Sequence, residues 1–229
     1  MSEADLDAIG LLQDPARRSL YTYVVGQGRD VSRNEAAAAV GLQRTLAAFH
    51  LDRLARAGLL DVAYRRLTAR SGPGAGRPAK LYRRRPDAEH AVSLPPRDYG
   101  RAAQVFAEAI ERCGAETVLY EVARERGAAA GRALAAASAG HRVTLGDLAR
   151  QLAERGYEPY ANADAACVRL RNCPFNAVAR EFPVVACGMN LALLDGMVSG
   201  GGLEDTHVAR LDPQPGGCCV SITSKTNSN

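Results

Sequence analysis

Residues 31–60 read VSRNEAAAAVGLQRTLAAFHLDRLARAGLL. This stretch gives the clearest indication of how the first part of the chain folds. Ser32, followed three residues later by Glu35, predicts a capping box that opens a short alanine-rich helix. Gly41 is expected to end that helix, because glycine readily takes the left-handed conformation that follows a helix C-terminus. A second helix is expected over residues 43–57. Two helices joined by a tight glycine turn are typical of a helix-turn-helix.

The segments around this stretch extend the motif. A helix is expected within the first 24 residues, with a restart at Asp14-Pro15, because Pro is favoured at the first helical position. After the stretch, residues 59–64 and 80–82 have the composition of two paired strands. The loop between them, residues 70–78, is rich in Gly, Pro and Arg. Two strands that close a basic loop behind a helix-turn-helix predict a winged helix-turn-helix.

The charge is unevenly distributed along the chain. Residues 1–97 contain 16 Lys and Arg against 10 Asp and Glu, whereas residues 98–229 contain 13 against 15. Residues 65–85 contain eight basic side chains and no acidic one. Such a cluster is the footprint of a surface that binds a polyanion, and we expect a double-stranded DNA operator as the partner.

The second helix of the motif carries residue types that read base edges. The residues expected to point outward are Gln43, Arg44, Thr45 and His50. Those expected to face the core are Leu46, Phe49 and Leu54. In the alternative interpretation, Gln43 and Arg44 contact only phosphates, and His50 serves in packing or on a phosphate.

The wing and its strands supply further basic residues for the DNA. The residues expected on phosphates or in a minor groove are Arg65, Arg66, Arg70, Arg77 and Lys80. The alternative interpretation makes the loop an ordinary solvated turn.

Three regions follow from these patterns, in an α+β protein. Residues 1–94 are expected to form the DNA-binding domain. Pro95-Pro96 breaks the chain, and helical spacing through residues 95–156 predicts a helical dimerisation region, by analogy with other winged-helix proteins and with two-fold symmetric DNA sites. Residues 157–229 are expected to form a small α/β domain that bears the cysteines. We therefore expect a homodimer.

Five of the six cysteines lie in the last region, and three of them fall at the predicted ends of helices or strands. These three are Cys173, Cys187 and Cys218. Free backbone N–H groups and helix-end electrostatics stabilise a thiolate at such places. No Cys-x-x-Cys pair is present, so the spacing is not that of a zinc ribbon or a zinc finger.

Two motifs, Asn-Cys-Pro-Phe at 172–175 and Ala-Cys-Gly-Met-Asn at 186–190, stand behind the winged helix and before a late cysteine. This combination resembles the SufR-type iron–sulfur transcriptional regulators, over nearly the whole chain. The resemblance implies a dimeric repressor of cluster-assembly genes that senses through an iron–sulfur cluster, a 4Fe-4S rather than a 2Fe-2S cluster. It implies Cys173, Cys187 and Cys218 as ligands.

The fourth ligand stays open at this point. Cyanobacterial members of the family have a cysteine shortly before a Thr-His pair, and here Thr206-His207 is present without that cysteine. The candidates are His207, Cys219, Cys167, a carboxylate such as Glu181 or Asp205, and a small exogenous molecule or water.

Other functions are weighed against this one. Three Cys and one His also form a common zinc set, so zinc is the alternative metal. A second alternative is a winged-helix repressor that responds to a small-molecule effector, with incidental cysteines. An enzyme is not expected, because no catalytic triad, paired carboxylate motif or P-loop occurs. The acidic N-terminus and the lack of about 18 consecutive uncharged apolar residues favour a cytoplasmic protein with no membrane partner.

Overall fold

The computed structural model describes residues 3–66, 78–85, 90, 97–138, 140–161, 167–214 and 217–225. The protein is mixed α+β, with two small antiparallel sheets. It divides into two compact units, Met1–Arg97 and Asp98–Asn229. The helices expected to form a separate dimerisation region therefore belong to the same compact unit as the cysteine-bearing segment.

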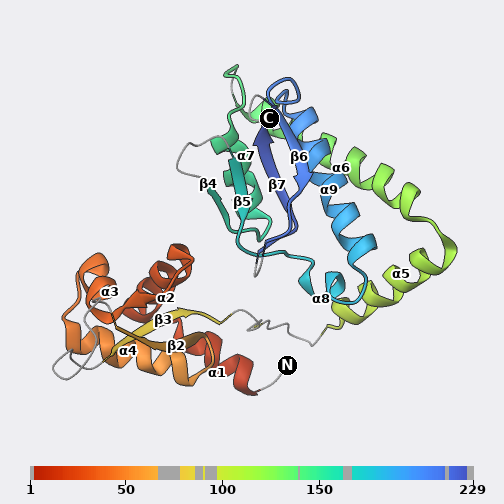
Figure 1. Cartoon of the computed structure of the whole chain (residues 1–229). Coiled ribbons are helices and arrows are strands. Elements are labelled where there is room, and N and C mark those ends of the chain that lie inside the picture. Colours follow the sequence, from red (N-terminus) through yellow and green to blue (C-terminus); the bar gives the residue numbers. More distant parts are fainter. Residues whose placement is uncertain are drawn as a thin grey trace. The chain divides into compact units, whose positions relative to one another are not determined.

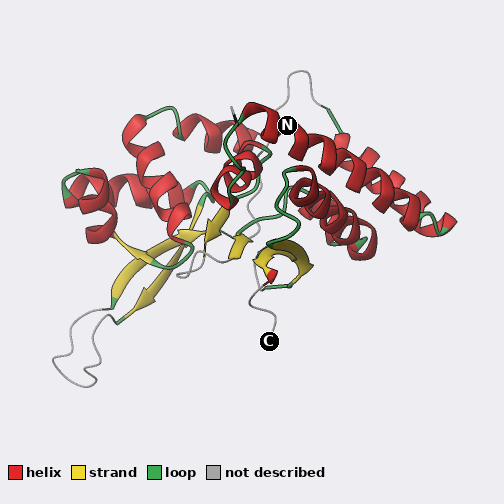
Figure 2. Ribbon diagram, turned by 90° about the horizontal axis from the view of Figure 1, so that it is seen from above, coloured by secondary structure: helices red, strands yellow, loops and turns green. Residues whose placement is uncertain are grey.

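The first unit combines helices with a three-stranded sheet (Figure 1). Its described elements follow in the order α1 (Glu3–Leu11), α2 (Pro15–Gln27), β1 (Val31–Ser32), α3 (Arg33–Val40), α4 (Arg44–Arg56), β2 (Leu60–Arg65) and β3 (Ala79–Arg84). The sheet has the strand order β1-β3-β2, and both pairings are antiparallel. Strands β2 and β3 form a ribbon that extends beyond the helices of the unit (Figure 2).

Local signals at the helix ends act much as the sequence predicts. Asp14 caps α2, since its carboxylate accepts the backbone N–H of Arg17 at 3.0 Å. Ser32 caps α3 by accepting the N–H of Glu35 at 3.2 Å. The carboxylate of Glu35 does not complete the predicted box, because it forms an ion pair with Arg29 instead.

The expected facing of α4 is wrong at three positions. Leu46 and Phe49 are 43% and 52% exposed, whereas His50 is buried. The side chains that fill the core lie at 47, 50, 51 and 54, which is the i, i+3, i+4, i+7 spacing of one helix face. Side-chain size suggested the other face, but the packing of α4 against α2, α3 and β2 places Ala47 and His50 in the interior.

The second unit places helices on one side of a four-stranded antiparallel sheet of order β4-β5-β7-β6. Its described elements are α5 (Tyr99–Cys113), α6 (Glu116–Ala137), α7 (Leu145–Glu154), β4 (Pro159–Ala161), β5 (Cys167–Leu170), α8 (Asn176–Ala179), α9 (Pro183–Gly200), β6 (His207–Leu211) and β7 (Val220–Ser224). Helices thus occupy the region in which helical spacing was expected, and helices and strands both follow it, as expected for an α/β segment.

Glycines let α6 and α9 pack closely along their length. A Cβ on Gly196 would lie 2.1 Å from the carbonyl oxygen of Arg124, and one on Gly127 would lie 2.0 Å from the carbonyl oxygen of Leu193. Both obstacles are backbone atoms, so no side-chain rotation could relieve the overlap. The two helices are therefore fixed to one another by close backbone contact.

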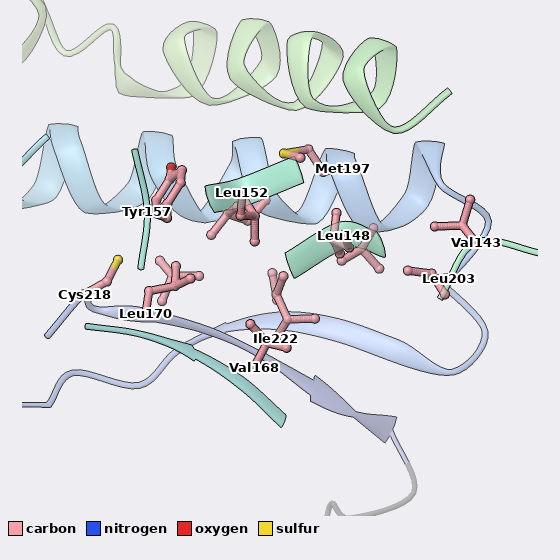
Figure 3. Packing of buried hydrophobic residues seen from close by; sticks show 14 residues of the cluster. Val143, Leu148, Leu152, Tyr157, Val168, Leu170, Met197, Leu203, Cys218 and Ile222 are labelled. Atoms are coloured by element: carbon pink, nitrogen blue, oxygen red, sulfur yellow. The ribbon is translucent and has the colours of Figure 1, made fainter. Parts of the chain in front are cut away.

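Helix α9 lies between α6 and the strands in Figure 3. Leu148 and Leu152 of α7 fill the space between α9 and the sheet, together with Ile222 of β7. By length and composition α9 could cross a membrane, but a buried core helix has the same properties, and Asp195 interrupts its apolar run. Met197, fully buried, anchors α9 in this core.

Candidate functional site

Four thiols come together in the second unit from three separate segments of the chain. Cys173 precedes α8, Cys187 lies in the second turn of α9, and Cys218 and Cys219 directly precede β7. Cys218 is buried, and the other three are partly exposed. The structure therefore brings together the three cysteines named from the sequence, and it adds Cys219.

The turn that carries Cys173 is held by its neighbour Asn172. The Asn172 side chain accepts the N–H of Glu158 at 2.6 Å and donates to the carbonyl of Gly156 at 2.7 Å. The ring of Phe175 packs edge-on against Tyr157, with the ring centroids 6.3 Å apart. Residues on both sides of Cys173 thus fix the turn against the segment that follows α7.

Cys187 is positioned by the packing of α9 on α6. The hydroxyl of Tyr120 on α6 donates to the carbonyl of Val184 at 2.8 Å. The same tyrosine ring lies so close to Gly188 that a Cβ there would be 2.3 Å from it. Cys187 also contributes to raising the pKa of Tyr120, after burial and Glu116. The Cys187 sulfur therefore lies close to Tyr120 of the neighbouring helix α6.

The Cys218-Cys219 pair is anchored to the ends of two strands. The N–H of Cys218 donates to the carbonyl of Leu170, the last residue of β5, at 2.9 Å. The carbonyl of Cys219 accepts the N–H of Asp212, which follows β6, at 2.7 Å. Backbone hydrogen bonds thus hold the vicinal cysteines at one end of the sheet.

Side-chain hydrogen bonds join Cys173 with Cys218, Cys218 with Cys219, and Cys219 with Cys187. The thiols of Cys173 and Cys219 donate to Cys218 and lower its pKa far below the usual range, against the opposing effect of burial. Their own pKa values are raised, first by this hydrogen bond and then by burial. Cys218 is therefore the thiol of the group that loses its proton most readily.

Two buried polar side chains form hydrogen bonds that reach the Cys218 sulfur from the core. The hydroxyl of Tyr157 donates to the Asn190 side-chain oxygen at 2.6 Å, and the Asn190 amide donates to the Cys218 sulfur at 3.2 Å. Asn190 is fully buried and Tyr157 nearly so. The sequence analysis missed this pair; the signal that could have revealed it is a polar residue three positions after Cys187 in an otherwise apolar helix.

The candidate ligand His207 lies away from the thiols. His207 begins β6 and pairs with Ser224, whereas the cysteine pair adjoins Val220 at the other end of β7. Four residues of a strand span about 13 Å, so His207 is not brought to the thiols. Its imidazole contacts the Thr206 hydroxyl at 2.8 Å, and burial lowers its pKa.

Two further cysteines are also apart from the group. Cys167 is buried in β5 opposite Thr223, where burial is the main cause of its raised pKa. Cys113 is exposed at the end of α5.

The residues predicted to bind DNA differ in their exposure to solvent. Gln43, Arg44 and Thr45 are exposed at the start of α4, and Arg65 and Arg66 are exposed at the end of β2 and just after it. Arg70 and Arg77 lie outside the described residues. His50 is buried with its Nδ1 unpartnered in the described structure, so it does not face outward as predicted.

Two of the basic residues expected on DNA are engaged in ion pairs. Lys80 is 2.5 Å from the carboxylate of Asp52, which also accepts the Tyr82 hydroxyl at 2.7 Å. Burial opposes ionisation of Asp52, but these hydrogen bonds prevail and its pKa is lowered. Arg65 pairs with Asp30 at 2.5 Å. Both cations are therefore partly neutralised within the unit.

The donor set of the thiol group suits a soft metal. Thiolate sulfur is the preferred ligand of iron–sulfur clusters and of zinc. Within the described ranges, no three His, Cys, Asp or Glu side chains are arranged to hold one metal ion. Four cysteine sulfurs are the donor set both of iron–sulfur clusters and of zinc sites with four cysteine ligands.

No protein-family model matches this chain, and neither a curated protein nor a solved structure is similar to it.

Proposed function

We propose that this protein is a homodimeric, DNA-binding transcriptional repressor that senses through a cysteine-ligated iron–sulfur cluster. The observation that carries the proposal is the convergence of Cys173, Cys187, Cys218 and Cys219 from three distant segments. Cysteines that served only as buried apolar side chains would have no reason to gather from three separate segments. The resemblance to SufR-type regulators names cluster-assembly genes as the targets.

In this proposal the four cysteines hold the cluster, and Cys219 supplies the fourth ligand. When bound, the cluster would supply a crosslink among three segments that oxidants or iron shortage can break. Asn190 and Tyr157 would orient the Cys218 sulfur, as hydrogen-bonding neighbours do in other metal sites. The partly exposed sulfurs give oxidants access to the site.

The DNA-binding role is proposed for the first unit as a winged helix-turn-helix. Its support is the succession of α3, a glycine turn and α4, followed by the β2–β3 ribbon. Gly41, with φ of 69°, makes the turn between the helices in the left-handed conformation. Arg44 and Thr45 then stand exposed at the N-terminus of α4, where recognition helices contact bases.

The dimer is proposed to form through α5 and the start of α6. These helices expose several large apolar side chains: Tyr99, Val105, Phe106, Val118 and Val122. Phe106 is 67% exposed. Contiguous exposed apolar side chains commonly mark a protein interface. The substitution Phe106→Glu places a charge among these side chains. It should lower the sedimentation coefficient from the value of a dimer to that of a monomer.

The packing of the second unit offers a route from the thiols to that interface. Cys187 lies on α9, and α9 is fixed on α6 by direct backbone contact at Gly127 and Gly196. Displacement of α9 must therefore carry α6 with it. A change at the thiols would then alter the dimer and the spacing of the two α4 helices, which must match the half-sites of an operator.

The test is anaerobic purification of the full-length protein, followed by visible absorption and assays of iron, sulfide and zinc. The wild type and Cys113→Ser, whose cysteine is exposed and remote from the group, should be brown and contain iron and sulfide. Cys173→Ser and Cys219→Ser should bleach or lose iron. A colourless protein with zinc would support the zinc alternative, and one without metal would support the effector-binding repressor.

A further inference from the structure

The outward face of α4 presents two large apolar side chains to solvent. Leu46 is 43% exposed and Phe49 is 52% exposed. The core of the first unit is filled without them, because Ala47, Leu51 and Leu54 of the same helix are fully buried. The sequence pattern had predicted both side chains to lie in the core, so their exposure became apparent only in the folded unit.

The surroundings of this apolar pair are basic. Arg44 precedes it and Arg53 and Arg56 follow it, and all three arginines are exposed. The one carboxylate of α4, Asp52, is engaged by Lys80 and the Tyr82 hydroxyl. A protein partner would need carboxylates around an apolar patch to match this surface. A DNA major groove combines flanking phosphates with one apolar group on its floor, the thymine methyl.

We propose that Phe49 and Leu46 contact thymine methyl groups in the major groove and make thymine a determinant of the operator sequence. The inference rests on the proposed DNA-binding function. Three residues along a helix rise about 4.5 Å, close to the spacing of about 3.4 Å between successive base pairs. The two side chains are thus spaced to contact the same or neighbouring base pairs, beyond the ones that Arg44 would contact.

The decisive test removes only the methyl group. Full-length protein selects its preferred duplex from random sequences, and each thymine of a half-site is then replaced singly by deoxyuridine. We expect about fourfold weaker binding at one or two positions, since burial of one methyl is worth about 0.8 kcal/mol. The other thymines should tolerate the replacement.

Protein variants assign the effect to its residue. In Phe49→Ala or Leu46→Ala the penalty for deoxyuridine should disappear at the position that the missing side chain contacts. The matched control is Leu6→Ala, which removes an apolar side chain of 44% exposure from α1. It should keep the full penalty. Circular dichroism establishes that the variants are folded, and the wild-type measurement with deoxyuridine needs no variant at all.

The outcomes separate the two proposals. Selective DNA binding with no deoxyuridine penalty at any thymine would overturn this inference alone. A wild type that selects no DNA sequence would remove the proposed function together with it. If Phe49→Ala changes the oligomeric state and leaves the deoxyuridine penalty intact, then the face belongs to a protein interface and the inference is wrong.

Discussion

Replacing Asn190 with leucine should destabilise the second unit by about 3 kcal/mol. Leucine has a similar volume but no polar group, so the hydroxyl of Tyr157, which is 3% exposed, loses the acceptor that lies 2.6 Å away. A buried polar group left without a partner costs about 1–3 kcal/mol. Loss of the N–H donor to the Cys218 sulfur at 3.2 Å adds about 1 kcal/mol.

The assay is urea unfolding of the reduced, metal-free protein, followed by circular dichroism. With a slope of about 2 kcal/mol per molar urea, the midpoint of the second unit should fall by about 1.5 M. Tyr157→Phe alone should also destabilise, because it leaves the Asn190 oxygen without its donor. The double variant should be more stable than Asn190→Leu, since it leaves no orphaned group between the two positions.

The double variant provides the critical comparison. If its loss of unfolding free energy equals the sum of the losses in the two single variants, the two side chains act independently, and the hydrogen bond between them does not stabilise the protein. An unchanged midpoint for Asn190→Leu would refute it equally.

The remaining predictions concern packing, ionisation and DNA binding. Gly196→Ala should lower the unfolding free energy by about 3 kcal/mol, because its methyl group would collide with the carbonyl oxygen of Arg124, whereas Gly10→Ala, with open space around it, should not. Because the pKa of Cys218 is lowered, the metal-free protein should show one thiolate by ultraviolet absorption at neutral pH, lost only on strong acidification and absent in Cys218→Ser. Arg44→Ala should weaken selective DNA binding at least tenfold and relax sequence preference in competition assays, whereas equal loss on random DNA would contradict a base-reading role.

The helices and strands of this protein could be predicted well from local signals. Ser32, Gly41 and Asp14 act at helix ends through hydrogen bonds and backbone conformations that involve only nearby residues. The paired strands β2 and β3 likewise follow from composition on either side of a stretch rich in Gly and Pro. Such features depend on interactions within a few residues, which is why a sequence reveals them.

The facing of α4 shows where local patterns are insufficient. Leu46 and Phe49 are the larger apolar residues, yet the core encloses Ala47 and His50. Helix α4 packs against α2, α3 and β2 with the face that carries positions 47, 50, 51 and 54. The shape of the neighbouring elements decides this, and no single-helix pattern contains it.

The candidate site could also be predicted only in part from the sequence. The sequence indicates that Cys173, Cys187 and Cys218 lie near the ends of helices or strands, in motifs that resemble those of an iron–sulfur regulator. The tertiary structure adds Cys219 to these three cysteines, which the order of residues along the chain does not reveal. The register of β6 against β7 places His207 at the end of the sheet away from Cys219, because strand pairing fixes the distance between residues remote in sequence.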